Sequence, residues 1–250
     1  MFRPRAQGYR LSMSKALLTG PHADEQQIAT SIADLVSDPT YPCVGAKSVF
    51  NRGTAEVVVM DQLADPGSTG DLLRHLAGFA AAHPRVTEAD DGLRLASLVI
   101  AFRAPVPGTE AQFEKLLWRQ LALLHEADGA RWDQRVSPDP DDPHFGFSAA
   151  GRAFFVIGMH PAASRLARRT PLPVLVFNLH DQFDRLRASG QYHRMRDIVR
   201  RRDTSLQGDV NPMAADHGTL SEARQYAGRQ VPGDWRPPYD LRTGEAREAR

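Results

Sequence analysis

A histidine at the end of an apolar run is the residue of this chain best suited to chemistry. The run, RAFFVIGM at residues 152–159, leads directly into His160 and Pro161. Three residues of the run share the histidine's face, since side chains alternate along a strand: Phe154, Val156 and Gly158. An apolar wall beside an imidazole suits haem, because the ring needs a hydrophobic slot and the iron an axial ligand. The gap left by Gly158 suits a flat macrocycle. The other interpretation is a histidine hydrogen-bonded at a sheet edge.

Cations follow this histidine closely. The segment after Pro161 contains Arg165, Arg168 and Arg169. A guanidinium group pairs well with a haem propionate or with the carboxylate of a substrate. Runs of arginine also commonly form a solvated surface, so the segment predicts cofactor-binding cations with surface charge as the alternative.

Three other side chains could ligate iron in place of His160: Cys43, His180 and His217. A cysteine thiolate is a known haem ligand, although a lone cysteine in an apolar turn is more often simple packing. His180 falls in the first turn of a predicted helix, where the helix dipole favours a neutral ring. His217 lies in ADHG, which is typical of a turn.

The composition excludes several classes of protein. The chain has 250 residues, a formal net charge of +1 and one cysteine. Near-neutral charge gives no reason to expect nucleic acid or an anionic membrane as partner. One cysteine cannot form a disulfide within the chain or a Cys-only zinc or iron–sulfur site.

No apolar run approaches the roughly 18 residues of a membrane span. We therefore expect a soluble cytoplasmic protein. Phosphate-binding, zinc-protease and serine-hydrolase motifs are absent.

The apolar spacing predicts a single α+β domain. Helices are expected over 24–36, 69–82, 109–127, 178–189, 192–202 and 221–226, and strands over 56–60, 93–102, 152–159 and 174–179. In the predicted helix over 178–189, we expect Asn178 to be the N-cap and Asp181 to occupy the capping-box position. The segment YPCVGAKSVFNRG, from Tyr41, has strand and turn character. Without a strict βαβ rhythm, a mixed, mainly antiparallel sheet packed by helices is the expected fold.

The expected limits of the domain are residues 22–240. Residues 1–21 form a flexible N-terminal lead-in, and residues 241–250 form a charged tail.

Several long segments resemble the YqcI/YcgG family, which includes haem-dependent nitrogen hydroxylases. They are PCVGAKSVF, FEKLLWRQLALLHEAD, FGFSAAGRAFFVIGMHPAASRLARR, PVLVFNLHDQFDRLR, RRDTSLQGDVNPMAADHG and SEARQYAGRQV. Together they cover most of the chain from about Tyr41 to Pro238. One departure is that a cysteine is expected in a WxCP-like segment near the C-terminus, whereas here Trp235 is followed by Arg236, Pro237 and Pro238.

The resemblance implies haem b and the oxygenation of a nitrogen by dioxygen, with electrons from an external donor. The implied substrate is a cationic amino acid or guanidino compound of the arginine type. His160 then becomes the leading candidate for the axial ligand. The carboxylates of Glu222, Asp216 and Asp203 are candidates to hold the substrate cation, with His217 in the same predicted catalytic group.

Two other functions stay open at this stage. One is a haem-binding sensor or carrier without turnover, and the other is a structural protein without a cofactor. A homodimer is also left open as an assembly.

Overall fold

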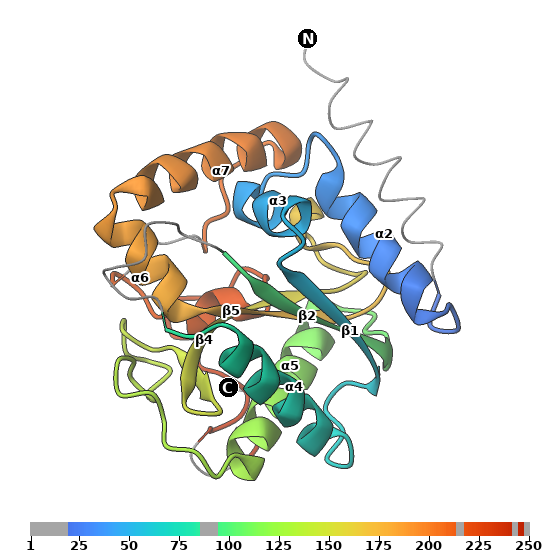
Figure 1. Cartoon of the computed structure of the whole chain (residues 1–250), viewed down its shortest axis with the longest axis vertical. Helices are drawn as coiled ribbons and strands as arrows, with labels where there is room; N and C mark the ends of the chain where they lie inside the picture. The colour runs from blue at the N-terminus through green and yellow to red at the C-terminus, as the bar shows by residue number, and fades with distance from the viewer. Residues whose placement is uncertain (1–19, 86–94, 214–217, 242–244, 248–250) are drawn as a thin grey trace.

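A five-stranded mixed sheet forms the centre of the computed structural model, which describes residues 20–85, 95–213, 218–241 and 245–247 (Figure 1). The strands are β1 (Ala55–Gln62), β2 (Ser97–Ala104), β3 (Phe147–Ala149), β4 (Arg152–Met159) and β5 (Val174–Leu179). Their order across the sheet is β1-β2-β5-β4-β3. Only the β1–β2 pair is parallel, and the other three pairs are antiparallel. The predicted mixed, mainly antiparallel sheet is therefore confirmed.

Helices occupy both faces of this sheet. They are α2 (Glu25–Ser37), α3 (Val44–Asn51), α4 (Thr69–Ala82), α5 (Glu110–Ala127), α6 (His180–Ala188), α7 (Gln191–Gln207) and α8 (Ala223–Tyr226). A short 3-10 turn, η1 (Leu166–Arg168), follows β4. Helix α4 supplies the crossover that a parallel strand pair requires, because it connects β1 to β2.

The first face of the sheet is fully closed by α4 and α5. Apolar residues recur at helical spacing in both helices and meet the alternate residues of the strands. The resulting core contains Leu72, Leu76, Phe79, Phe113, Leu117, Leu121, Leu98, Ile100, Phe102, Phe154, Val156, Leu175 and Phe177. Burial of this many large side chains away from water makes the first face the main source of the fold's stability.

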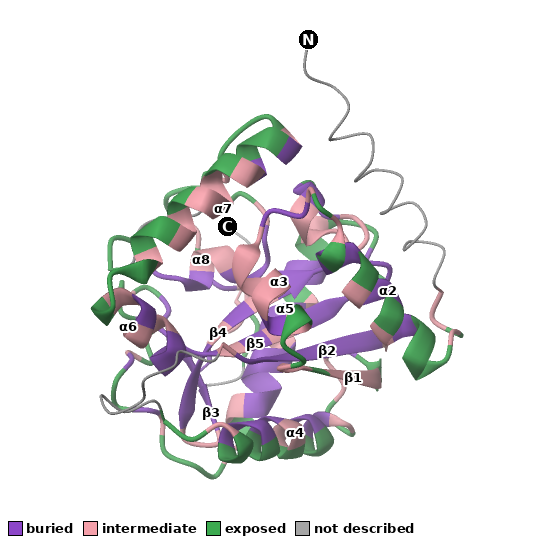
Figure 2. Cartoon of the chain, turned by 45° about the horizontal axis from the view of Figure 1, so that its top comes forward, coloured by how far each residue is buried: buried purple, intermediate pink, exposed green. Residues whose placement is uncertain are grey.

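The second face is closed only in part. Helix α2 buries Ile28, Ile32 and Leu35 against Val99, Ala101, Met159 and Val174. Helices α3 and α7 also lie on this side but bury little: α3 buries only Val49, and the 17-residue α7 buries only Asp203 and Leu206. Figure 2 shows α7 mostly in the colours of exposed and intermediate residues. Four strand residues that alternate with those of the first face are only partly buried: Phe155, Ile157, Val176 and Asn178. We refer to these four residues as the half-buried face.

Two of the predicted elements are wrong. The segment predicted as strand and turn contains α3, whose first turn is capped by the Cys43 sulfur accepting a bond from the Ala46 N–H. Asn178 does not cap α6. Its side chain instead accepts a hydrogen bond of 2.6 Å from the Ser97 hydroxyl, and the N-cap position falls to Leu179 without a side-chain bond. The cap of α3 is local, whereas the partner of Asn178 lies 81 residues away in the sequence. The limits expected for the domain and the tail stay predictions.

Gly158 in β4 is the point where α5 approaches the sheet most tightly. A Cβ atom built there would lie 2.5 Å from the Phe113 ring and 2.7 Å from Leu117. Both distances are well inside van der Waals contact, so only a glycine permits this packing. The glycine fixes the depth at which α5 sits on β4.

We expect Gly158→Ala to lower the free energy of unfolding by about 1–3 kcal/mol, because the new methyl group would overpack the core. Gly78→Ala is the matched control, since nothing lies within 4 Å of its Cβ position in α4. That change should be neutral or stabilising by up to about 1 kcal/mol. Urea unfolding of the two variants measures the difference. Equal stabilities would show that α5 does not pack against Gly158 as described.

Candidate functional site

His160 lies just beyond the end of β4 and is fully buried. Its backbone N–H donates to the Arg168 carbonyl at 2.9 Å, which fixes the turn after the strand. Its ring stacks on Phe113 with centroids 4.3 Å apart, and neither ring nitrogen has a hydrogen-bond partner among the described residues. Burial lowers the pKa of His160 to about 4, and the nearby Glu110 carboxylate offsets only part of this. The imidazole is therefore neutral at pH 7.

The slot predicted beside His160 is filled by protein. Phe154 and Val156 point into the closed core, and the gap expected at Gly158 contains the Phe113 ring and Leu117. In this structure α5 occupies the gap expected for a flat macrocycle, and the use of the gap by a cofactor stays a prediction. His160 as an iron ligand stays a prediction, and its two nitrogens without partners remain the one feature in its favour.

The three predicted cofactor-binding arginines all serve the protein itself. Arg165 pairs with Asp203 and Asp209. Arg169 donates to the Ala163 carbonyl at 2.6 Å. Arg168 donates to two carbonyl oxygens, those of Gly158 at 2.9 Å and Gln225 at 3.3 Å. These bonds position the loop after β4. If the arginines also bind haem propionates, they do so in addition to this structural role.

Arg168, unlike Arg165, has no carboxylate partner among the described residues. Burial lowers the pKa of its guanidinium, while the nearby Tyr41, Cys43 and Asp203 raise it in part. A cation that is poorly solvated and unpaired favours a negative charge nearby. Cys43 is one of the groups that can supply this charge.

The thiol of Cys43 is half-exposed at the start of α3. Its sulfur accepts a hydrogen bond of 3.4 Å from the Ala46 N–H, and a helix N-terminus favours negative charge. The sulfur atoms of Cys43 and Met195 both lie 3.8 Å from a Cβ built on Gly45, so α3 and α7 meet over a residue without a side chain. Cys43, Ile157 and Val176 pack against the same buried cluster. The thiol thus belongs to the side of the molecule that carries the half-buried face.

A buried chain of polar side chains lies beside this face. Glu222 accepts a hydrogen bond of 2.5 Å from the Tyr226 hydroxyl, and its other oxygen lies 2.8 Å from Nε2 of His180. The Tyr226 ring is 5.9 Å from that of Phe155, edge to face. Tyr226 is not among the residues predicted from the sequence, although its spacing of four residues from Glu222 on a helical segment is a signal for such a contact. The three groups can hold or pass a proton between Glu222 and His180.

The protonation predicted for His180 is wrong. Burial lowers the pKa of its ring, but the hydrogen bond and charge of Glu222 outweigh burial, and the net shift is upward. The predicted position of His180 in the first turn of α6 is confirmed. The contact with the Glu222 carboxylate affects the pKa of the ring more than the helix dipole does. Because the folded-state pKa is raised, this pair stabilises the fold fully below the ordinary histidine pKa, and the contribution is lost as pH rises through the folded-state pKa.

The predicted carboxylates are not free in the described structure. Glu222 is shared by His180 and Tyr226, and Asp203 pairs with Arg165. Asp216 and His217 lie outside the described residues. Within the described residues, no group of three or more His, Cys, Asp and Glu side chains is arranged to hold a metal ion. A search of the same residues finds no helix long and apolar enough to cross a membrane.

The open mixed sheet with helices on both faces defines an α+β protein. The chain belongs to the YqcI/YcgG family, whose model matches residues 32–240. No solved structure matches the chain.

Two curated proteins are similar to this chain. An "Uncharacterized protein YcgG" of Bacillus subtilis (strain 168) is 25% identical over 186 residues, which cover 72% of this chain and 71% of that protein. The "Putative N(omega)-hydroxy-L-arginine synthase DcsA" of Streptomyces lavendulae is 26% identical over 174 residues, which cover 67% of this chain and 62% of DcsA.

We expect His160 to make the fold acid-sensitive. Its folded-state pKa is about 4 against an ordinary value of 6.5, so the unfolded chain binds a proton first as pH falls. The free energy of unfolding should therefore drop by roughly 3 kcal/mol between these two pH values. Urea unfolding at several pH values should show a shallower acid dependence in His160→Leu. The exposed His22→Gln is the control and should follow the wild type. An unchanged acid slope in His160→Leu would contradict the neutral buried ring.

Proposed function

We propose that this protein hydroxylates a guanidine or amine nitrogen of an arginine-type amino acid, using dioxygen, two external electrons and haem b. The observation that carries the proposal is the alignment with DcsA over two thirds of this chain, together with this chain's membership of the YqcI/YcgG family. In the proposed reaction one oxygen atom ends on the substrate nitrogen. The other leaves as water with two protons and the two electrons.

The haem proposal depends on which residues could hold the group. The wall beside His160 does not fit a macrocycle, because Phe113 and Leu117 occupy it. The surroundings of Cys43 fit better: a half-exposed thiol, an arginine without a carboxylate and an apolar surface that the helices leave partly uncovered. We therefore propose that Cys43, in place of His160, would hold the haem iron. Haem held by a thiolate supplies the activation of dioxygen.

Side chains of the protein would compensate charge, exclude water, supply protons and bind the substrate. The charge of Arg168 would stabilise the Cys43 thiolate and compensate negative charge beside it. Phe155, Ile157 and Val176 would exclude water from the half-buried face. The chain from Tyr226 through Glu222 to His180 would supply protons from a buried store next to Phe155. The substrate cation would need a carboxylate, and Asp203 or Glu222 would have to exchange its present partner for it.

The proposal is tested with protein supplied with haem. We expect a Soret band in the wild type that is lost or shifted in Cys43→Ser and retained in His160→Leu. With L-arginine, dioxygen and a reducing system, mass spectrometry should detect a product heavier by one oxygen atom. Lysine and other guanidino acids extend the search for the substrate.

The outcomes separate the alternatives. A band lost in His160→Leu but unchanged in Cys43→Ser would return the ligand to His160. A Soret band without oxygenation of any such substrate would instead identify a haem-binding sensor or carrier. The absence of a band after reconstitution would refute the haem proposal.

A further inference from the structure

A second, separate feature of the molecule is an open hollow ringed by arginines. Its volume is about 490 Å³, and its wall includes Arg85, Arg131, Trp132, Asp133, Arg135 and Gly151. None of these residues belongs to the group around Cys43 and the half-buried face. The hollow is within the size range of small-molecule sites.

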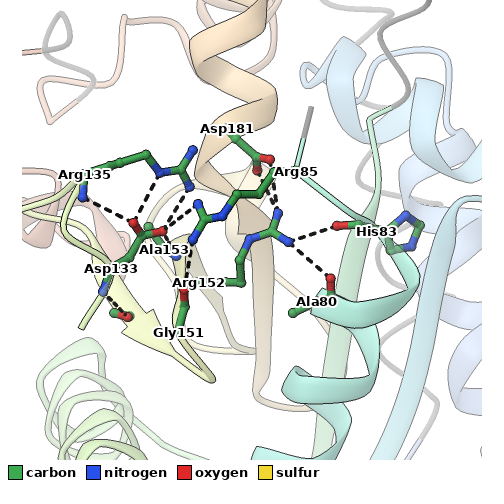
Figure 3. Close-up of polar contacts among 10 residues, drawn as sticks. Ala80, His83, Arg85, Asp133, Arg135, Gly151, Arg152, Ala153 and Asp181 are labelled. Atoms are coloured by element: carbon green, nitrogen blue, oxygen red, sulfur yellow. Dashed lines mark hydrogen bonds and ion pairs between the residues drawn. The ribbon is translucent and has the colours of Figure 1, made fainter. Parts of the chain in front are cut away.

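A single buried carboxylate organises the hollow. Figure 3 shows Asp133 between Arg85 and Arg135, receiving bonds from both guanidinium groups. The Ala153 N–H donates to the same carboxylate at 3.0 Å, and the Asp133 N–H donates to the Ser148 hydroxyl at 2.9 Å. Burial alone would raise the pKa of Asp133, but the bonds from Arg135 and Ala153 hold it well below its usual range. Asp133 therefore stays ionised, and its carboxylate holds the side chains of Arg85 and Arg135 in position.

Arg85 and Arg135 are held in position by Asp133 but remain partly exposed to solvent. The side chains of Arg85 and Arg135 are 44% and 40% exposed, whereas that of Asp133 is 3% exposed. Arg85 also donates to the Gly151 carbonyl at 3.1 Å, which fixes its plane. Each guanidinium therefore keeps N–H groups for another partner, and the cost of ordering the side chain is already met by the fold.

The charges around the hollow do not balance. Arg131 is exposed and has no ion-pair partner among the described residues. Three guanidinium groups and one carboxylate leave a net charge of +2 on the wall. The neighbouring Arg152 and Asp181 pair with each other at 3.1 Å and leave this sum unchanged. A hollow lined by one sign of charge raises the local concentration of the opposite ion.

We propose that this hollow binds the phosphate group of a small phosphate monoester. A phosphate carries about −1.5 to −2 charge at pH 7 and presents three acceptor oxygens, which matches the excess charge and the number of arginines. A carboxylate has one charge and would leave half of the excess uncompensated. A cationic substrate of the arginine type is repelled, so the hollow is distinct from the proposed substrate site. Trp132, half-buried on the wall, offers an apolar surface to the rest of such a molecule.

The test is calorimetric titration of the full-length protein with inorganic phosphate and with a nucleoside 5′-monophosphate, at constant ionic strength set by chloride. We expect saturable binding to the wild type that weakens about tenfold in Arg131→Gln, the loss of one charge-assisted contact. Arg131 has no described partner, so this variant should fold normally. Arg74→Gln is the control, because Arg74 is an exposed arginine of α4 that pairs with Asp71 away from the hollow.

The two ligands distinguish the source of the phosphate. Tighter binding of the monophosphate, with a change in Trp132 fluorescence that disappears in Trp132→Phe, supports a phosphorylated metabolite. Tighter binding of inorganic phosphate, again weakened in Arg131→Gln, supports the phosphate site but overturns the role of Trp132. The proposal fails if neither ligand binds the wild type, or if Arg131→Gln and Arg74→Gln bind them equally. Each result is independent of haem content and of nitrogen oxygenation.

Discussion

The contact between α5 and Gly158 determines which side of the sheet can hold a ligand. Because β4 has no side chain at this point, Phe113 and Leu117 reach the strand backbone and leave no space behind them. The first face is consequently a solid core in which a cavity would carry a cost for every methylene group removed. The second face has no equivalent contact, since α3 and α7 bury only three residues between them. Of the two faces of the sheet itself, only the second is therefore incompletely packed.

Buried charges in the described residues are paired on both sides of the sheet, as Arg165 and Asp203 also show. Buried charges are tolerated where they are paired, as with Arg152 and Asp181 or with Glu114 and Arg229. Arg168 departs from this pattern beside Cys43, where carbonyl oxygens solvate its charge without neutralising it. Natural proteins commonly retain such imbalance at functional sites, because a ligand completes the local charge. The electrostatic exception and the incompletely packed surface thus coincide on one side of the molecule.

Local pattern was sufficient for most of the fold and insufficient for most of the site. The helix over 69–82 and the strands over 152–159 and 174–179 follow from periodicity, and the structure has the same bounds. Partners distant in the sequence were not accessible to this reasoning. The gap at Gly158 was predicted correctly as a missing side chain, but the ring that fills it comes from a helix 45 residues earlier. Likewise, a dipole argument for His180 could not include a carboxylate 42 residues away. Sequence spacing therefore identified reactive residues but did not reveal their hydrogen-bond and packing partners in the folded protein.

The position of β2 also has a consequence for the order of folding during synthesis. This strand pairs with β1 on one side and with β5 on the other, and β5 emerges from the ribosome roughly seventy residues after β2. Until then the largely apolar β2 has one unpaired edge that can pair with another nascent chain. Helix α5, which is made next and covers one face, cannot satisfy these backbone groups. Protection of the edge depends on the segment Val174–Leu179, so chains interrupted before it should be held by chaperones or aggregate.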